Sequence, residues 1–573
     1  MKTDLAPHHN SSRMTRFNIA QALEERAKHA PFQPAVIFPA GRDKQGRAKF
    51  TQLSFQQLNE LCDSYAYGLA GYGLTQGTRT LIMVKPGIDL IAVTFALLKI
   101  GAVPVLIDPG MGHKAFLQCV TETEPRAMIG IPLAHIIRTI FPRAFRTITH
   151  FITAGRRLFW SGKTLDALRI RGKSPFPAAP TTLEDEAAVA FTSGGTGIPK
   201  GVVYLHGIFK KQLEIMQNDM GIEEGEVHLA VMYIFALFNP ALGVTSVIPD
   251  MDPRRTAELN PAYLVEAIQT HGVTMSLGSP LIWEILGNYC LKQNISLPSL
   301  KHIFMFGAAV MPDVIEKFAK VMPQGRIYTP YGATEALPLT MLDAEDILQD
   351  TGPKTYQGAG VCVGKPIGGL QVRIIPISDE AIHHWDESLC LAVGEIGEIV
   401  VKGGVVTHRY LNRPQHSAEA KICDHNGVWH RMGDLGYIDQ QGRIWICGRK
   451  AHRVSTPQGL MLPIQCEAIF NRHQDVKRSA LIGIGKYGQQ RPLIIIESMP
   501  GTQPRSRAVK KAFADSLLIL GKQYEASRSI QTILFHSAFP VDVRHNTKID
   551  RLALAEWAAR ELKKESALTK LVL

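Results

Sequence analysis

An alternation of short apolar runs and helical patterns constrains the fold of this chain more than any other sequence feature. Residues 81–84 predict a buried strand, residues 89–99 a mostly apolar helix, and residues 103–107 a second strand. A strand, a helix and a strand at this spacing form a βαβ unit, which implies a parallel sheet covered by helices. Strand-like runs recur at residues 273–278, 303–307 and 325–329. We therefore expect an α/β fold.

The length of the chain and the changes in its strand and helix patterns predict several domains. A chain of 573 residues is too long for a single hydrophobic core. From about Val361, short β-type runs are separated by glycine with little helix between them, and the pattern becomes mixed again after Lys450. We expect a flexible segment at residues 1–16 and a large domain at 17–449 that includes a small β-rich subdomain. A small, mobile α+β domain should follow at 450–573.

Composition narrows the class of protein. A content of 45% hydrophobic and 20% charged residues is typical of a soluble globular protein. The net charge of +12 is spread without a block of five like charges, which favours a generally basic surface over a nucleic-acid site and is compatible with an anionic substrate or a membrane surface. The eight cysteines are scattered, which argues against structural zinc.

No segment predicts export or a membrane span. Residues 1–16 contain no apolar run, so we expect no secretory signal. The long uncharged stretch at residues 227–249 is interrupted by Asn239, Pro240 and Gly243, and we interpret it as a buried pocket wall and not as a transmembrane segment. The expected location is the cytoplasm.

Residues 192–201, T-S-G-G-T-G-I-P-K-G, lie between two expected strands at 187–191 and 201–205. Glycines allow a backbone to wrap closely around an anion, and hydroxyl groups and a lysine add donors and charge. The residues concerned are Thr192, Ser193, Gly194, Gly195, Thr196, Gly197 and Lys200. A flexible surface turn would explain the glycines alone. A Walker loop is excluded because proline precedes the lysine and glycine follows it. The segment predicts a phosphate-binding loop.

A second segment, Tyr331-Gly332-Ala333-Thr334-Glu335, follows an expected strand and supplies an aromatic face, a hydroxyl and a carboxylate. By itself it could be a turn with a capping glutamate. Together with the glycine-rich loop, it resembles the core motifs of the adenylate-forming enzymes, which include acyl-CoA synthetases, luciferases and peptide-synthetase adenylation domains. The usual loop of that family has serine where this chain has Gly195.

The resemblance extends through further motifs that occur in the family's order up to residue 548. It implies ATP and Mg²⁺ as cofactors and assigns roles to single residues. Tyr331 would stack on adenine, with Gly332 beside it in the nucleotide site; Thr334 would contact the α-phosphate, and Glu335 would hold the metal. The adenine would approach the backbone at Gly307, Ala308 and Ala309, the ribose would bind Asp434, and Arg449 would contact the nucleotide. Lys450 would be the hinge and Lys548 the catalytic lysine.

Several segments depart from the CoA-ligase pattern: residues 454–459 lack its lysine and acidic run, and residues 233–241 lack its pocket histidine. With residues 245–253 and 539–548, they resemble the β-lactone synthetases of bacterial long-chain olefin biosynthesis. That resemblance implies adenylation of a 2-alkyl-3-hydroxy fatty acid, whose own hydroxyl then closes a β-lactone. It places the acyl pocket at Phe235, Phe238 and Asn239, although core packing also explains part of this segment.

The sequence leaves open which residue accepts the hydroxyl proton and which of several related functions the chain has. His430, His452 and His545 are candidates for removing the hydroxyl proton. The alternative functions are a fatty acyl-CoA or acyl-AMP ligase and, from another class, an inactive lipid-binding scaffold. The expected partners are a long-chain hydroxy fatty acid and other enzymes of the same lipid pathway or a membrane surface, without nucleic acid.

Overall fold

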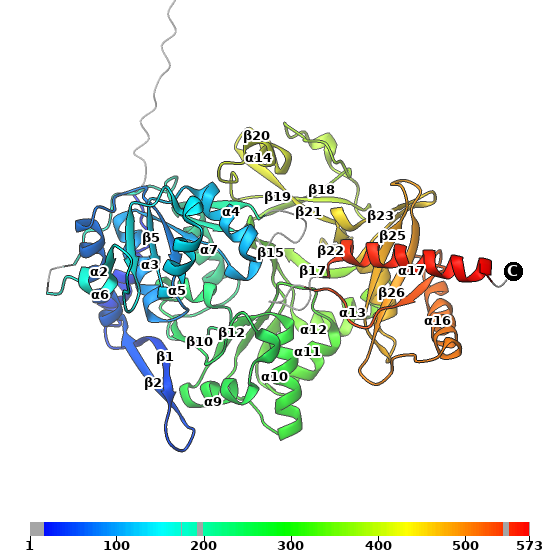
Figure 1. The fold of residues 1–573 in the computed structure, drawn as a ribbon, viewed down its shortest axis with the longest axis horizontal. Coiled ribbons are helices and arrows are strands. Elements are labelled where there is room, and N and C mark those ends of the chain that lie inside the picture. The colour runs from blue at the N-terminus through cyan, green and yellow to red at the C-terminus, as the bar shows by residue number, and fades with distance from the viewer. Residues whose placement is uncertain (1–15, 173–174, 192–198, 542–548, 572–573) are drawn as a thin grey trace, which may run out of the picture.

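The computed structural model describes residues 16–172, 175–191, 199–541 and 549–571 (Figure 1). The predicted α/β class is confirmed, because two mainly parallel sheets with helices packed around them build residues 16–328. A third sheet is antiparallel, and two small sheets follow residue 453. In Figure 1 the C-terminal elements, coloured orange to red, lie beside the green and yellow parts of the chain.

The first sheet is parallel except for its last strand, which pairs antiparallel and forms the predicted hairpin around the glycine-rich loop. In spatial order its strands are β7 (Lys163–Thr164), β6 (His150–Thr153), β5 (Ala127–Gly130), β3 (Arg79–Met83), β4 (Val103–Leu106), β8 (Glu186–Phe191) and β9 (Gly201–Leu205). Its helices are α2 (Phe55–Gly71), α3 (Ile88–Ile100), α4 (His113–Thr123), α5 (Pro132–Ile140), α6 (Leu165–Leu168) and α7 (His206–Asn218). Helix α3 is buried on nearly all sides, which explains why its sequence lacks a polar stripe.

The second sheet is also parallel, apart from an antiparallel pair that begins the chain. Its strands are β14 (Arg326–Tyr328), β13 (His302–Met305), β12 (Met275–Gly278), β10 (Val227–Leu229), β11 (Thr245–Val247), β1 (Pro34–Arg42) and β2 (Ala48–Ser54). The accompanying helices are α1 (Gln21–His29), α8 (Asn239–Leu242), α9 (Pro261–His271), α10 (Pro280–Gln293) and α11 (Pro312–Ala319). Strand β1 therefore joins a sheet whose other parallel strands lie far along the sequence.

The third sheet is the β-rich part expected near Val361. Its strands are β15 (Tyr331–Ala333), β16 (Ala336–Met341), β17 (Val361–Pro366), β22 (Ile444–Arg449), β21 (Gly427–Ile438), β19 (Gly397–Lys402) and β18 (Gln371–Ile375), with β20 (Lys421–Asp424) paired to β21. Short helices accompany it: α12 (Ala344–Asp346), α13 (Gly352–Thr355) and α14 (Pro414–Ala420). Its strand β21 is longer than the short β-type runs expected in this part of the chain.

The C-terminal part forms two small sheets with three helices. The strands are β23 (Val454–Thr456) with β24 (Gly459–Met461), and β25 (Val476–Ile484), β26 (Arg491–Ser498) and β27 (Ile533–Phe535). The helices are α15 (Pro463–Asn471), α16 (Arg507–Lys522) and α17 (Arg551–Leu571). Within the described ranges, no helix has the length and apolar character needed to cross a membrane.

Candidate active site

A large cavity of about 2120 Å³ lies where the two parallel sheets, the third sheet and the C-terminal part meet. The carboxyl ends of parallel strands open into it, which is where α/β proteins usually bind ligands. Its wall includes these predicted nucleotide-site residues: Lys200, Gly307, Ala308, Ala309, Tyr331, Gly332, Thr334, Glu335, Asp434 and Arg449. The structure therefore gathers motifs that are up to 249 residues apart in the sequence around one space.

Two groups of predicted residues lie outside the described part of the chain. They are Thr192 to Gly197 of the glycine-rich loop, and Lys548 with His545 near the C-terminus. Their described neighbours Lys200 and Ile549 both line the cavity. The ammonium group of Lys200 lies 5.0 Å from the centroid of the Tyr410 ring. The roles of the loop and of Lys548 stay predictions from the sequence.

Asp434 is a buried carboxylate at the centre of the third sheet. The hydroxyl of Tyr331 donates a hydrogen bond to Asp434 Oδ2 at 2.6 Å, and Arg449 Nε lies 3.2 Å from Oδ1. Arg449 also donates to the carbonyl of Met432 at 3.1 Å. Burial raises the pKa of Asp434, and the neighbouring guanidinium of Arg449 partly opposes that rise. A carboxylate in this position can accept hydrogen bonds from vicinal hydroxyl groups such as those of a ribose.

Glu335 and Thr334 are held by two tyrosine hydroxyls from different strands and loops. Tyr410 donates to Glu335 Oε1 at 2.7 Å, and Tyr204 donates to the Thr334 carbonyl at 2.6 Å. The backbone N–H of Thr407 also donates to the Glu335 carbonyl at 2.9 Å. The carboxylate of Glu335 is therefore fixed toward the cavity by contacts on both its main chain and its side chain.

The turn at Gly307 has φ of +90°, a conformation that side chains strongly disfavour. A Cβ atom added there would meet nothing within 4 Å, so the backbone conformation, and not crowding, calls for glycine. The following residues Ala308 and Ala309 have small side chains and line the cavity. This part of the wall leaves room for a flat ligand against the backbone.

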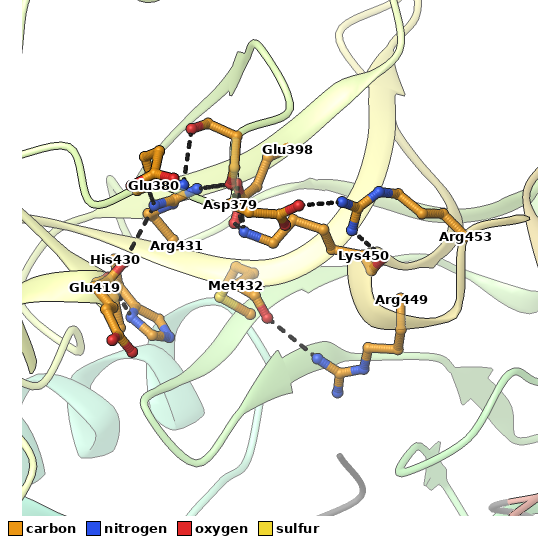
Figure 2. A network of polar contacts seen from close by, with 12 residues as sticks. Asp379, Glu380, Glu398, Glu419, His430, Arg431, Met432, Arg449, Lys450 and Arg453 are labelled. Atoms are coloured by element: carbon orange, nitrogen blue, oxygen red, sulfur yellow. Dashed lines mark hydrogen bonds and ion pairs between the residues drawn. The ribbon is translucent and has the colours of Figure 1, made fainter. Parts of the chain in front are cut away.

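Lys450, the predicted hinge residue, is anchored to the third sheet through a buried carboxylate (Figure 2). Its ammonium group donates to the Ser378 carbonyl at 2.8 Å and lies 3.2 Å from Glu398, which is 1% exposed. Arg431 from β21 binds the same carboxylate at 2.6 Å. Arg453 pairs with Asp379 and donates to the Lys450 carbonyl at 2.7 Å. The Glu398 carboxylate thus links Lys450, where the chain enters its C-terminal part, to β21, the strand that carries Asp434.

The two described histidine candidates both line the cavity, but burial makes them weak bases. Burial, together with the charge of Lys421, lowers the pKa of His430 well below its usual value. Burial and the charge of Arg551 lower the pKa of His452 to about 4. Both rings are therefore neutral at pH 7, and His430 is further engaged with the Ala420 carbonyl at 3.2 Å.

The acyl pocket predicted at residues 233–241 is placed in part on the cavity wall. Phe235 and Phe238 line the cavity, and Phe235 packs edge-to-face on Phe306 with ring centroids 5.0 Å apart. Asn239 is not among the lining residues, because its amide is buried behind the wall. It donates to Ser246 at 2.8 Å and contacts the ring of His228. The asparagine supports the wall and does not face the space.

Comparisons with known proteins agree with this geometry. The AMP-binding enzyme family matches residues 23–411. The chain is 44% identical over 562 residues to the olefin β-lactone synthetase of Stenotrophomonas maltophilia, a match that covers 96% of this chain and 99% of that protein. It is 42% identical over 564 residues to the olefin β-lactone synthetase of Xanthomonas campestris, with coverage of 96% and 99%. The chain belongs to the AMP-binding enzyme family and, within it, to the olefin β-lactone synthetases.

Among solved structures, the AMP-binding enzyme resembles the O-succinylbenzoate coenzyme A synthetase of Bacillus subtilis in complex with ATP and magnesium. The TM-score is 0.72 at 19% identity, with 94% of this chain and 99% of that chain covered. At this identity the likeness concerns the fold alone. It confirms that the three-sheet architecture with its C-terminal part is that of adenylate-forming enzymes.

The donor set of the cavity is compatible with magnesium that is bound together with a nucleotide. In the described residues, no group of three or more His, Cys, Asp or Glu side chains comes together as a metal site. Mg²⁺ typically keeps several waters and binds one or two carboxylates plus substrate phosphates. The single carboxylate of Glu335 beside a nucleotide site fits that pattern.

Sequence reasoning missed the residues that support these motifs. Tyr410 and Tyr204 hold the 334–335 turn, and Glu398 joins Arg431 to Lys450. The buried Lys421 donates to the Thr407 carbonyl, and burial lowers its pKa to about 7. Their partners lie between 14 and 130 residues away, so no local spacing signals these pairs.

Proposed function

We propose that this AMP-binding enzyme uses ATP and Mg²⁺ to activate a 2-alkyl-3-hydroxy fatty acid and then closes it to a β-lactone. The observation that carries the proposal is the near full-length similarity to two olefin β-lactone synthetases. The cavity volume of about 2120 Å³ supports it, since sites for one small ligand usually occupy about 300–1000 Å³. This space suits a nucleotide together with a long-chain acid.

In the first step, the substrate carboxylate attacks the α-phosphorus of ATP, an acyl–phosphate bond forms, and pyrophosphate leaves. Asp434 would orient the ribose, while Tyr331 and the 307–309 turn would hold the adenine. Two anions must approach each other in this step, and the cations Lys200, Arg449 and Lys548 would lower their repulsion. Mg²⁺, held by Glu335 together with the phosphates, would neutralise charge on the leaving pyrophosphate.

In the second step, the 3-hydroxyl oxygen bonds to the acyl carbon, the bond from that carbon to the AMP oxygen breaks, and the hydroxyl proton is released. The hydroxyl is tethered to the reacting carbon, so it has an effective concentration that a diffusing thiol lacks. The low pKa of His452 makes this residue a poor acceptor for the proton at pH 7. No external acyl acceptor is required by this scheme.

The decisive experiment supplies a 2-alkyl-3-hydroxy fatty acid, ATP and Mg²⁺ without CoA. We expect a β-lactone, AMP and pyrophosphate, detected by mass spectrometry of the organic extract and by nucleotide analysis. The matched acid without the 3-hydroxyl should stop at the adenylate. A CoA thioester as the major product when CoA is added would overturn lactone synthesis and favour the acyl-CoA ligase alternative. Absence of AMP with either acid would support the inactive scaffold.

A further inference from the structure

A cluster of exposed apolar side chains surrounds helix α5. Of the 18 large apolar side chains that lie exposed in the described part of the chain, six fall within residues 133–159. We call them the α5 patch: Leu133, Ile136, Ile140, Phe141, Leu158 and Phe159. Phe159 is 77% exposed and Ile140 is 63% exposed. Such a concentration of large apolar side chains on one short stretch marks an interaction site.

The two halves of the α5 patch are joined by a fixed contact. The buried ring of Trp160 stacks on His135 of α5, with centroids 5.2 Å apart and planes 7° from parallel. The Trp160 indole donates to Thr153 at 2.9 Å, and the His135 ring contacts the Ile152 carbonyl at 3.1 Å. These bonds hold the loop with Leu158 and Phe159 against the helix, so the patch is a formed surface.

The charged residues of the stretch that carries the patch all have one sign. Between Glu124 and Asp166 the sequence contains seven basic residues and no acidic residue. They are Arg126, Arg138, Arg143, Arg146, Arg156, Arg157 and Lys163, and all except Arg138 are exposed. A second copy of the chain docked symmetrically on this face would oppose basic residues with basic residues. An anionic lipid surface complements both the charge and the apolar side chains.

Helix α5 also forms part of the cavity wall. Its residues Leu133, Ala134 and Ile137 line the cavity, and Leu133 is at the same time 54% exposed. The helix therefore contributes residues both to the cavity wall and to the exposed α5 patch. A surface bound to the outer face of α5 would lie next to the apolar part of the substrate space.

We propose that the α5 patch docks the enzyme on an anionic lipid surface, from which a long-chain substrate reaches the cavity past α5. The docking follows from the α5 patch alone, whereas the route of the substrate rests on the proposed function. Phe141, Leu158 and Phe159 enter the boundary between headgroups and acyl chains, and the basic side chains contact lipid phosphates. This mode requires no spanning helix and holds the enzyme by a reversible interaction.

The test is sedimentation of the full-length protein with vesicles, without any substrate, so its outcome does not depend on lactone synthesis. Vesicles of 70% phosphatidylcholine and 30% phosphatidylglycerol are compared with pure phosphatidylcholine. We expect strong preference for the anionic vesicles that weakens with salt. Arg156→Glu/Arg157→Glu should lower partitioning by at least about 30-fold, the loss expected at roughly 1 kcal/mol per basic residue before the repulsion of the new carboxylates is added. Phe141→Ser/Phe159→Ser should lower it by at least about tenfold.

Matched controls change the same residue types elsewhere on the surface. Phe32→Ser removes a phenylalanine that is 85% exposed, and Lys510→Glu/Lys511→Glu reverses two exposed charges on α16; both should bind as wild type does. Equal binding of wild-type protein to both vesicle types would overturn the proposal, as would wild-type partitioning of the patch variants. Concentration-dependent self-association that disappears in the patch variants, without vesicle binding, would assign the patch to a second copy instead.

Discussion

Replacing Tyr410 with phenylalanine tests whether Glu335 acts as the metal-binding carboxylate. The Tyr410 hydroxyl lies 2.7 Å from Glu335 Oε1 and is the one side-chain donor to this carboxylate that we find in the described residues. Phenylalanine keeps the buried ring and the surface that faces Lys200. The variant therefore removes one hydrogen bond and little packing.

The size of the effect follows from the type of bond. A hydrogen bond to a charged group contributes about 1.5–3 kcal/mol. Glu335 is partly exposed to the cavity, so water replaces some of the lost donor, and we take the lower limit. About 1.5 kcal/mol corresponds to roughly tenfold in an equilibrium constant. The Mg²⁺ concentration for half-maximal pyrophosphate release should rise about tenfold in Tyr410→Phe, because the carboxylate is no longer held in position.

A matched control is Tyr204→Phe. This variant removes a tyrosine hydroxyl that contacts Thr334, the residue next to Glu335. Tyr204 donates to the uncharged carbonyl of Thr334 at 2.6 Å. This variant should lose about 0.5–1.5 kcal/mol of stability while its Mg²⁺ dependence stays that of wild type. Pyrophosphate release is measured at saturating ATP across a Mg²⁺ titration. Identical Mg²⁺ curves for the two variants would refute the role given to Glu335.

Two further predictions concern the C-terminal part. Lys548→Ala should lower adenylate formation by about 10²- to 10³-fold with near wild-type ATP binding, because a charge stabiliser of the transition state is lost; near wild-type pyrophosphate release would contradict this. Burial of Glu497 opposes its ionisation. The hydrogen bonds that it accepts from Arg478 and Lys477 outweigh this effect and lower its pKa to about 2. The ionised Glu497 therefore adds roughly 3 kcal/mol to the free energy of unfolding above pH 4.5, and this contribution is lost as the pH falls toward 2. Glu497→Gln should lose about that much stability at pH 7 and respond less to acid in urea unfolding, and an unchanged pH profile would argue against the pairing.

The local elements were predictable where side-chain pattern and burial agree. A capping box of Ser54 and Gln57 begins α2, and the βαβ unit around α3 forms as its apolar runs predicted. Strand β21 was underestimated because polar residues such as Arg431 and Asp434 interrupt its apolar pattern. Arg431 lies buried within the strand because Glu398 and three backbone carbonyls accept its hydrogen bonds, which only the folded chain reveals.

The residues of the candidate site also fall into a group that the sequence could predict and a group that it could not. Motifs made of consecutive residues, such as those around Thr334 and Asp434, were predictable because they carry their chemistry within a few positions. The tyrosines that hold them were not, since Tyr410 reaches Glu335 across 75 residues. Asn239 was predicted to face the acyl group from its sequence neighbours, but a hydrogen bond to Ser246 turns it into the core.

The pairing of β1 sets the order in which this chain can fold. Val36 of β1 faces Ser246 of β11, whereas every strand of the first sheet lies within residues 79–205. At about 5–20 residues per second, the ribosome needs roughly 10–40 s to make the intervening chain. During that time the β1–β2 hairpin has no parallel partner, and an isolated hairpin has marginal stability. The segment synthesised early is thus buried late, and until β11 has been made its open strand edge is available for pairing with another chain.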